Sequence, residues 1–303
     1  MKEYKRISSC LVRGGICVIV KEIFNVGDFI MPQPFLSVLI LTKNNQRSIN
    51  YALMSVQPYA DEIIVLDSGS QDKTLEIANR YTDKIYFREF EGHFGQQKNY
   101  GLSKCTGKWI FILDSDEFIG ENFATTLKYL HSGFKCITMP RYHICSISQW
   151  SHFVTKAHYY DWQKRLIKND SNIFYGNNKV HENLQNYSPR LHCAAGHIFH
   201  LDFLLHDYTA RAKKSAFYDH LAGGGYPQLY LPENYPYYTM PMQELSEPDI
   251  LQALRRDKSF REYELRENYF ITLRECCKWK VRQAATSLRV ALKFRFAELA
   301  ISP

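Results

Sequence analysis

The chain has 303 residues, of which 45% are hydrophobic and 15% aromatic, and it carries a formal net charge of +7 at pH 7. A chain of this length and composition can bury at least one full hydrophobic core, so it is not a disordered polar chain. We expect one catalytic domain with an appendage. Its eight cysteines are scattered without CxxC pairs and no secretory signal precedes them, so we expect reduced thiols in a cytosol rather than a disulfide framework.

The segment from Cys10 to Met31 is apolar, but charged residues such as Arg13 and Lys21 interrupt it. No run is long enough to span a bilayer, so a transmembrane anchor is not expected and a cytoplasmic location is favoured. The positive charge suits an anionic partner such as a nucleotide, an anionic membrane surface or nucleic acid, and a merely solvated basic surface is the alternative.

The first predicted element is a strand from Leu36 to Thr42, because its sequence LSVLILT is an unbroken apolar run typical of a strand buried on both faces. A polar turn that begins at Asn44 follows. Apolar residues at helical spacing then predict a helix from Ile49 to Val56, which stops at Pro58.

The same alternation continues to residue 113. Strands are predicted at 63–66, 84–87 and 109–113, and helices after an N-cap at Asp72 and at 96–104. Alternating strands and helices indicate a parallel sheet with crossover helices, which binds ligands at the carboxyl ends of its strands. Thr42, Asp67 and Asp114 fall at those ends.

Beyond Pro140 the pattern changes to dense aromatics and histidines, which we interpret as the acceptor half of the same domain. Residues from 208 look helical, 223–241 look like an irregular loop and 247–300 are helix-prone and arginine-rich. The predicted organisation is an N-terminal extension (1–34), a catalytic domain (35–207, with a nucleotide-sugar half at 35–118 and an acceptor half at 119–207) and a mainly helical C-terminal region (208–303).

The acidic triplet Asp114-Ser115-Asp116 follows the fourth strand, and side chains two apart in extended structure can converge on one hard cation. Strand ends are also commonly capped by aspartates, so a structural role is the alternative. Asp67 opens a second tight polar turn, where a carboxylate can accept from a ribose hydroxyl or a base N–H, or can simply cap the helix.

Three segments together, LSVLILTKNN, ADEIIVLDSGSQDKT and FGQQKNYGLSKCTGKWIFILDSDE, resemble family 2 glycosyltransferases. The branch they resemble contains lipopolysaccharide-core glucosyltransferases and peptide S-glycosyltransferases. The likeness is dense from Phe35 to Phe118 and continues faintly through YDWQKRLIKND, NNKVHENL and GHIFHLDF. It implies a GT-A fold and inverting chemistry.

The resemblance also implies roles for individual residues. Thr42 and Asp67 would contact the base and ribose, and Lys98 would face the nucleotide or its phosphates. Asp116, helped by Asp114, would hold a divalent cation, Mn²⁺ or Mg²⁺. The expected nucleotide-sugar set is Thr42, Asn44, Asp67, Lys98, Asp114 and Ser115.

An inverting transfer needs a base near the acceptor, and Glu182 in Val180-His181-Glu182 is the first candidate, with Asp161 as its competitor. His200 is a candidate third metal ligand, although a structural histidine is the alternative, and His197 shares that ambiguity. Aromatic residues of the acceptor half are candidate sugar platforms or core, namely Trp150, Tyr159, Tyr160 and Trp162. The basic residues Arg211, Lys213 and Lys214 either approach the diphosphate or face solvent.

The predicted function is therefore transfer of a hexose, with glucose from a UDP donor favoured, to an unidentified acceptor. Candidate acceptors are a lipid-linked or lipopolysaccharide sugar, a peptide, a wall polymer or a modified nucleic-acid base. A nucleotidyltransferase is the first alternative, but it should carry a Gly-rich loop where this chain reads TKNNQRS. The second is a non-catalytic binding protein, favoured only if Glu182 and Asp116 point away from a common cleft. A peripheral contact with an anionic membrane and a homo-oligomer are further candidate associations.

Overall fold

The computed structural model describes residues 35–263 apart from 121, 156, 159–160, 181, 223–229, 235–236, 243–247 and 261. The predicted N-terminal extension and the last forty positions, 264–303, lie outside the described residues. The domain boundaries after residues 34 and 207 stay predictions.

Strands and helices alternate through the first part of the described chain, as the sequence predicted. The elements are β1 (Leu36–Thr42), α1 (Ile49–Val56), β2 (Glu62–Asp67), α2 (Thr74–Ala78), β3 (Ile85–Phe87), α3 (Phe94–Leu102) and β4 (Trp109–Asp114). The strands pair in the order β3-β2-β1-β4, and each of these pairs is parallel. The predicted parallel sheet is confirmed for this part of the chain.

Shorter elements follow and extend the sheet. They are β5 (Glu117–Ile119), α4 (Phe123–Leu127), the 3-10 helix η1 (Lys128–His131), β6 (Cys136–Ser146), β7 (Ser151–Thr155), β8 (Asp161–Lys168), β9 (Arg190–His192), β10 (Ile198–His200), α5 (Asp202–Leu205), α6 (Tyr208–Ala222), η2 (Pro232–Asn234), β11 (Tyr237–Pro241) and α8 (Pro248–Arg256). The main path of the sheet is β11-β7-β6-β8-β4-β1-β2-β3. Because β8 is antiparallel to β4 and to β6, the whole sheet is mixed.

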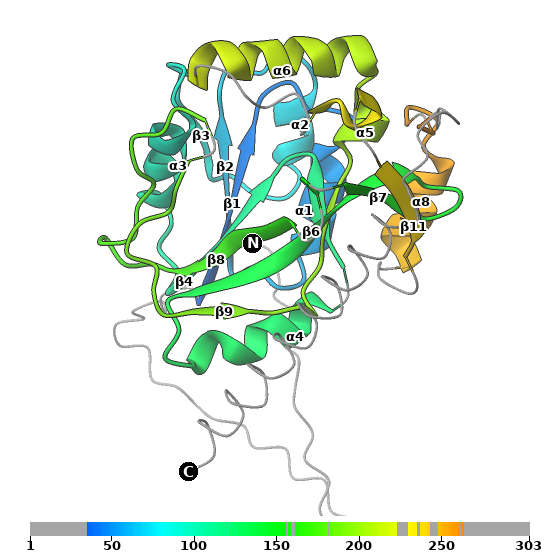
Figure 1. Cartoon of the computed structure of the whole chain (residues 1–303). Helices are drawn as coiled ribbons and strands as arrows, with labels where there is room; N and C mark the ends of the chain where they lie inside the picture. The colour runs from blue at the N-terminus through cyan, green and yellow to red at the C-terminus, as the bar shows by residue number, and fades with distance from the viewer. Residues whose placement is uncertain are drawn as a thin grey trace, which may run out of the picture. The chain divides into compact units, whose positions relative to one another are not determined.

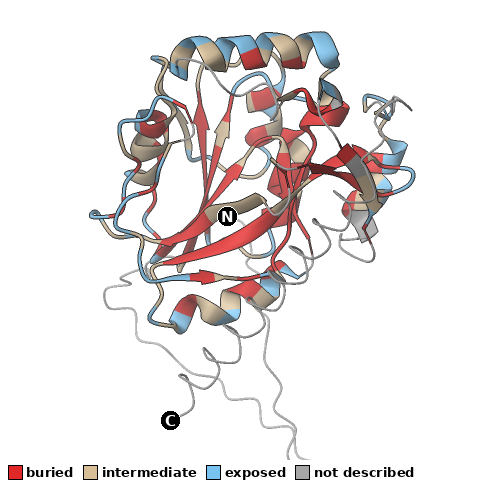
Figure 2. Cartoon of the chain, viewed as in Figure 1, coloured by how far each residue is buried: buried red, intermediate tan, exposed pale blue. Residues whose placement is uncertain are grey.

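The central strands are buried on both faces, which explains their unbroken apolar runs. In β1, Val38 and Ile40 join the core that also contains Leu53 of α1, whereas Leu39 joins a second core with Ile173. Figure 2 shows the buried strands lying between helices whose outer sides are exposed. The parallel strands are thereby held from two sides, and their carboxyl ends are fixed in position.

Helix α6 lies across the carboxyl ends of the parallel strands (Figure 1). Its predicted start at residue 208 is confirmed. Arg211 is buried in α6 and donates to the carbonyl oxygens of His206, at 3.2 Å, and Tyr230, at 2.7 Å. These bonds attach the helix to the segments before and after it.

One prediction for the C-terminal region was wrong, because 237–241 is a strand rather than part of an irregular loop. The strand, β11, pairs antiparallel with β7, which lies much earlier in the chain. It is the last strand on the path of the sheet. Proline has no N–H to donate, and an edge strand tolerates this because only one of its sides is paired with another strand. A short strand whose partner is distant leaves little periodicity to read in its own sequence.

None of the helices in the described part is long and apolar enough to cross a bilayer. Four cysteines fall in that part, and all are buried and free of disulfides: Cys105, Cys136, Cys145 and Cys193. Burial raises the pKa of the Cys136 thiol to about 12. The other four cysteines lie outside the described residues.

Candidate active site

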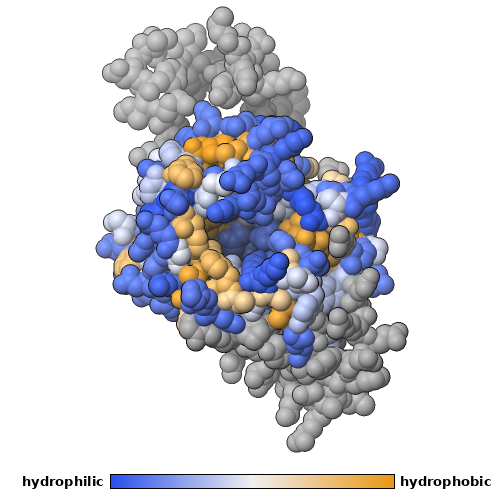
Figure 3. Space-filling model, turned by 90° about the horizontal axis from the view of Figure 1, so that it is seen from above, coloured by the Kyte–Doolittle hydropathy of each residue, from blue (hydrophilic) through white to orange (hydrophobic). Residues whose placement is uncertain are grey.

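A cavity of ≈ 940 Å³ opens at the carboxyl ends of β1 and β4, with α6 on its far wall. Figure 3 shows this hollow from above, with polar residues deep inside it and apolar residues on part of its margin. Most of the residues predicted for the site line it, namely Thr42, Asn44, Lys98, Asp114, Ser115, Asp116, Asp161, Glu182 and His200. Of the predicted nucleotide-sugar, base and cation residues, Asp67 does not line it.

Three potential cation ligands meet at one end of this cavity. Asp116 follows β4, His200 ends β10 and Asp202 begins α5, and their ligand atoms all lie within 4.8 Å of one another. The antiparallel pairing of β10 with β5 aligns His200 with Glu117, and the Leu201 N–H donates to the Asp116 carbonyl at 2.9 Å. Strand pairing therefore joins residues that are far apart in the sequence.

The donor set of this cluster fits a divalent cation. Carboxylates and imidazoles are both common ligands of divalent cations in proteins. His200 Nε2 lies 3.2 Å from Asp116 Oδ2. Burial opposes both charges, but each partner outweighs it, so the pKa of Asp116 is lowered and the pKa of His200 is raised. Asp202 was not predicted, although its place two residues after His200 was the available signal.

Asp114 lies apart from this cluster although it had been predicted to help hold the cation. It pairs with Arg165, which also donates to Glu117 Oε1 at 2.7 Å. Burial would raise the pKa of Asp114, but Arg165 outweighs it and keeps that pKa well below its ordinary value. Asp116 thus belongs to the cluster, whereas Asp114 pairs with Arg165.

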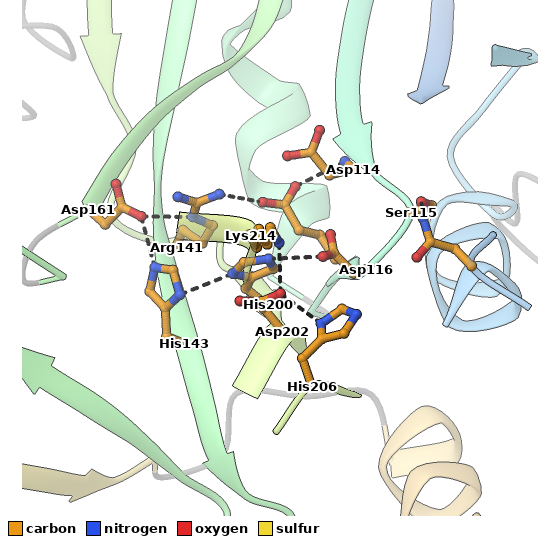
Figure 4. A network of polar contacts seen from close by, with 12 residues as sticks. Asp114, Ser115, Asp116, Arg141, His143, Asp161, His200, Asp202, His206 and Lys214 are labelled. Carbon is orange, nitrogen blue, oxygen red and sulfur yellow. Dashed lines mark hydrogen bonds and ion pairs between the residues drawn. The ribbon is translucent and has the colours of Figure 1, made fainter. Parts of the chain in front are cut away.

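Asp161 is held by two basic side chains (Figure 4). Arg141 Nε donates to Asp161 Oδ2 at 2.7 Å, and His143 Nε2 lies 3.1 Å from the same oxygen. His143 Nδ1 in turn lies 3.0 Å from His200 Nδ1, which connects Asp161 to the potential cation ligands. Burial would raise the pKa of Asp161, but Arg141 and His143 keep it well below its ordinary value. A carboxylate held in this way is a weak proton acceptor.

Glu182 forms an ion pair with Lys98 of α3. Burial would raise the pKa of Glu182, but Lys98 outweighs it and lowers that pKa. Lys98 Nζ also lies 5.1 Å from the centre of the Tyr175 ring. Glu182 therefore depends on one ion pair, whereas Asp161 has an ion pair with Arg141 and a second contact with the ring of His143.

The predicted residues at or just after the ends of β1 and β2 have two kinds of surroundings. Some line the cavity, and others form hydrogen bonds within the turns. Thr42 Oγ1 is buried without a hydrogen-bond partner among the described residues. Asn44 has φ 55 and accepts from the Gln71 N–H at 2.7 Å. The Asp67 carboxylate accepts from the N–H groups of Gly69, at 2.8 Å, and Ser70, at 3.0 Å, which matches the turn alternative.

His197 and the aromatic candidates also differ in their surroundings, because some are packed in the core and one lines the cavity. His197 is buried against Tyr142, with ring centres 5.4 Å apart, and Trp150 packs on Phe199 in the core. Trp162 lines the cavity. Tyr159 and Tyr160 lie outside the described residues.

Of the three basic candidates on α6, only Lys214 reaches the cavity. Its Nζ donates to Asp202 Oδ1 at 2.7 Å, and His206 Nδ1 lies 3.0 Å from the same oxygen. Burial would raise the pKa of Asp202, but Lys214 outweighs it and that pKa stays well below its ordinary value. Lys213 is exposed and Arg211 is buried in the support of the helix.

Comparison with known proteins places this geometry in a family. Residues 37–193, just over half of the chain, match the model described as glycosyl transferase family 2. The chain therefore belongs to glycosyltransferase family 2. The described sheet with its flanking helices confirms the predicted α/β class of GT-A type.

Relatives named as glycosyltransferases match parts of the chain. An uncharacterized glycosyltransferase of Rickettsia bellii is 36% identical over 95 residues, which are 31% of this chain and 32% of that protein. One of Haemophilus influenzae is 29% identical over 126 residues, 39% of this chain and 50% of that protein. The prophage-derived glycosyltransferase SunS of Bacillus subtilis is 26% identical over 160 residues, 52% and 36% respectively. The chain spans about a third of the length of the Rickettsia relative.

Solved structures show a weaker likeness. Residues 1–349 of Staphylococcus aureus TarS, in complex with UDP, align with 48% of this chain and 52% of that one, at 19% identity and a TM-score of 0.38. Glucosyl-3-phosphoglycerate synthase of Mycobacterium tuberculosis, with Mn²⁺ and UDP-glucose, aligns with 36% of this chain and 44% of that one, at 21% identity and a TM-score of 0.32.

Proposed function

We propose that the protein is an inverting, metal-assisted glycosyltransferase that moves a hexose, with glucose from a UDP-sugar favoured, to an acceptor hydroxyl or thiol. One observation carries the proposal: Asp116, His200 and Asp202 line the same cavity as the carboxylate of Glu182. Glu182 and Asp116 line one cavity, which argues against the alternative of a non-catalytic binding protein.

The cation end of the cavity suits the leaving group. A divalent cation held by Asp116, His200 and Asp202 would stabilise the charge that develops on the diphosphate as the glycosidic bond breaks. Lys98 and Lys214 add two ammonium groups to the cavity wall. Thr42, at the end of β1, lines the same cavity.

Glu182 suits the role of general base. It would accept the proton of the acceptor as the nucleophile attacks the sugar on the face opposite the diphosphate, which inverts the anomeric carbon. Asp161 is the weaker candidate, because Arg141 and His143 both stabilise its ionised form. Glucose and UDP are favoured by the resemblance of the Phe35–Phe118 segment to lipopolysaccharide-core glucosyltransferases.

A donor screen tests the proposal. Nucleotide release is measured from UDP-, GDP- and dTDP-sugars, with and without Mn²⁺, on the full chain. We expect slow hydrolysis of a UDP-hexose that needs the cation. Release without any dependence on the cation, or from none of the donors, would contradict the proposal.

The Asp116→Ala variant tests the cation assignment separately. Loss of one hard oxygen ligand should abolish Mn²⁺-dependent UDP binding, measured by calorimetry, while the protein stays folded. Asp83→Ala, at an exposed aspartate that does not line the cavity, is the matched control and should bind as the wild type does.

A further inference from the structure

Lys214 is the only lysine of α6 that lines the cavity, and its ammonium is bound to one of the three cation ligands. The side chain is mostly buried, at 28% exposure, and it reaches Asp202 from the helix that lies across the strand ends. Figure 4 shows Lys214, Asp202, His200 and Asp116 gathered in one group. The positive charge that balances Asp202 therefore comes from the protein itself.

The Asp202 oxygen that accepts from Lys214 has a second close neighbour, so both of its lone pairs in the plane of the carboxylate are used. Asp202 Oδ1 accepts from Lys214 Nζ at 2.7 Å and lies 3.0 Å from His206 Nδ1. A divalent cation at Asp116, His200 and Asp202 would stand within a few ångströms of this ammonium, and like charges at that distance repel strongly in a buried site. Cation and ammonium thus compete for the same carboxylate.

A nucleoside diphosphate would relieve this competition. Its phosphate oxygens carry the negative charge that an ammonium displaced from Asp202 requires, and Lys214 is anchored on the wall that faces them. The ring centre of Tyr230 lies 5.6 Å from Lys214 Nζ, so the side chain runs along an aromatic surface rather than into packed core. A short movement of the side chain is enough to change partners.

We propose that Lys214 is an internal counter-ion of the cation site, which a divalent cation displaces from Asp202 and which then binds the diphosphate of the donor. This inference rests on the proposed function and makes the binding of cation and nucleotide interdependent. The cation alone binds weakly because it must displace an ammonium that has no other anion to bind. With the nucleotide present, the displaced Lys214 ammonium binds the diphosphate instead.

Manganese binding to the full chain, without turnover, tests the inference. Free Mn²⁺ is followed by electron paramagnetic resonance during titration, with and without UDP. In the wild type, UDP should tighten Mn²⁺ binding by about tenfold or more, and Mn²⁺ should tighten UDP binding by the same factor, because coupling is reciprocal. In Lys214→Met, Mn²⁺ alone should bind about tenfold more tightly, UDP alone more weakly, and the coupling factor should fall toward one.

Lys213→Met is the matched control, because Lys213 is the adjacent lysine of the same helix but is exposed and does not line the cavity. It should behave as the wild type does. Should Lys214→Met fail to fold, Lys214→Gln removes the charge and keeps a donor for Asp202. Unchanged or weaker binding of Mn²⁺ alone in the neutral variant, with coupling intact, would overturn the inference and leave the proposed function standing. No Mn²⁺ binding by the wild type, even with UDP, would overturn both.

Discussion

Glu182 and Asp161 line one cavity but differ in what holds each carboxylate ionised. Asp161 contacts both Arg141 and His143, which are themselves fixed by strand β6. The partner of Glu182 is Lys98, which the family resemblance assigns to the nucleotide and its phosphates. A donor that attracts Lys98 would weaken the ion pair and leave Glu182 a stronger base.

The two carboxylates are separated by replacing each with its amide. Glu182→Gln should keep UDP binding but lower transfer by about 10²- to 10⁴-fold, because an amide cannot accept the proton of the acceptor. Asp161→Asn should reduce transfer less, through disturbance of Arg141 and His143. Transfer rates and UDP affinity are measured on both variants, and a larger loss of transfer in Asp161→Asn would reverse the assignment.

Glu62 illustrates a carboxylate with a structural task. It pairs with Lys84 at 2.6 Å and accepts from Ser37 and from the Thr106 N–H, the latter at 2.9 Å. Burial would raise its pKa, but these donors lower it below the ordinary value of 4.5. Because the unfolded chain holds the proton more tightly, the stabilisation is complete above the unfolded pKa and is lost as pH falls through the lower folded pKa.

The Glu62→Gln variant should therefore lose about 1–3 kcal/mol of unfolding free energy at pH 7. The difference from the wild type should shrink as the pH is lowered below 4.5, where the wild-type carboxylate also takes up a proton. Urea unfolding at several pH values measures both effects. Glu76→Gln is the control, since its side chain is 61% exposed and its change should stay within about 0.5 kcal/mol.

At the scale of elements, the sequence pattern predicted the strands and helices that depend on the residues within each element. The runs that became β1, β2 and β4 are apolar because both faces of each strand are covered. Asp116 and His200 were named as candidates because each comes at or just after the end of an apolar run. Asp202 and Arg165 were not predicted, and Lys214 could not be told apart from Arg211 and Lys213, because their places depend on strand pairing and on a helix that crosses the sheet.

Helix boundaries show the same limit on a smaller scale. The helix predicted from residue 96 begins at Phe94, because the ring of His93 accepts from the Gln96 N–H at 3.1 Å. A histidine in the N-cap position is not among the usual capping residues, so the pattern gave no reason to expect it.

The approach of α3 to the segment that carries Glu182 requires a glycine. A Cβ on Gly95 would lie 2.7 Å from the carbonyl oxygen of Gly176. The Phe94 N–H donates to the Lys179 carbonyl at 3.0 Å, so the helix start is fixed to that segment. The contact sets the distance between Lys98 of α3 and its partner carboxylate.

Gly95→Ala should consequently destabilise the fold by about 1–3 kcal/mol and weaken UDP binding, because a backbone oxygen must move to admit the methyl group. Gly133→Ala is the matched control, since a Cβ there meets nothing within 4 Å. Urea unfolding and a UDP titration are run on both. Equal behaviour of the two variants would show that the close approach is not required.

At the scale of the whole molecule, the predicted membrane contact falls in the tail, outside the described residues. Its basic residues are interleaved with large apolar ones, a pattern that can lay a segment on an anionic bilayer: Arg274, Lys278, Lys280, Arg282, Arg289, Lys293 and Arg295. The structure decides where the tail can be removed. Ile250 and Leu254 of α8 are buried in a core shared with Tyr51, so the cut belongs after Tyr263.

We expect the full chain to co-sediment with anionic vesicles and the chain ending at Tyr263 to stay in the supernatant. Neutral vesicles should bind neither chain, because the attraction is to the negative surface. Both chains should give the same UDP affinity, which shows that the shorter one is folded. Equal recovery of both chains in the supernatant with anionic vesicles would remove the membrane prediction and favour a soluble acceptor.

The pairing of β5 with β10 has a consequence for synthesis. Asp116 leaves the ribosome early, whereas His200, Asp202 and then Lys214 leave much later, and contacts between distant segments form slowly. A nascent chain that already carries the recognisable family segments therefore lacks the complete group of potential cation ligands, and its apolar strands still lack part of their cover. The cluster of Asp116, His200 and Asp202 is therefore completed only late in the synthesis of the domain, when the strands also gain the rest of their cover.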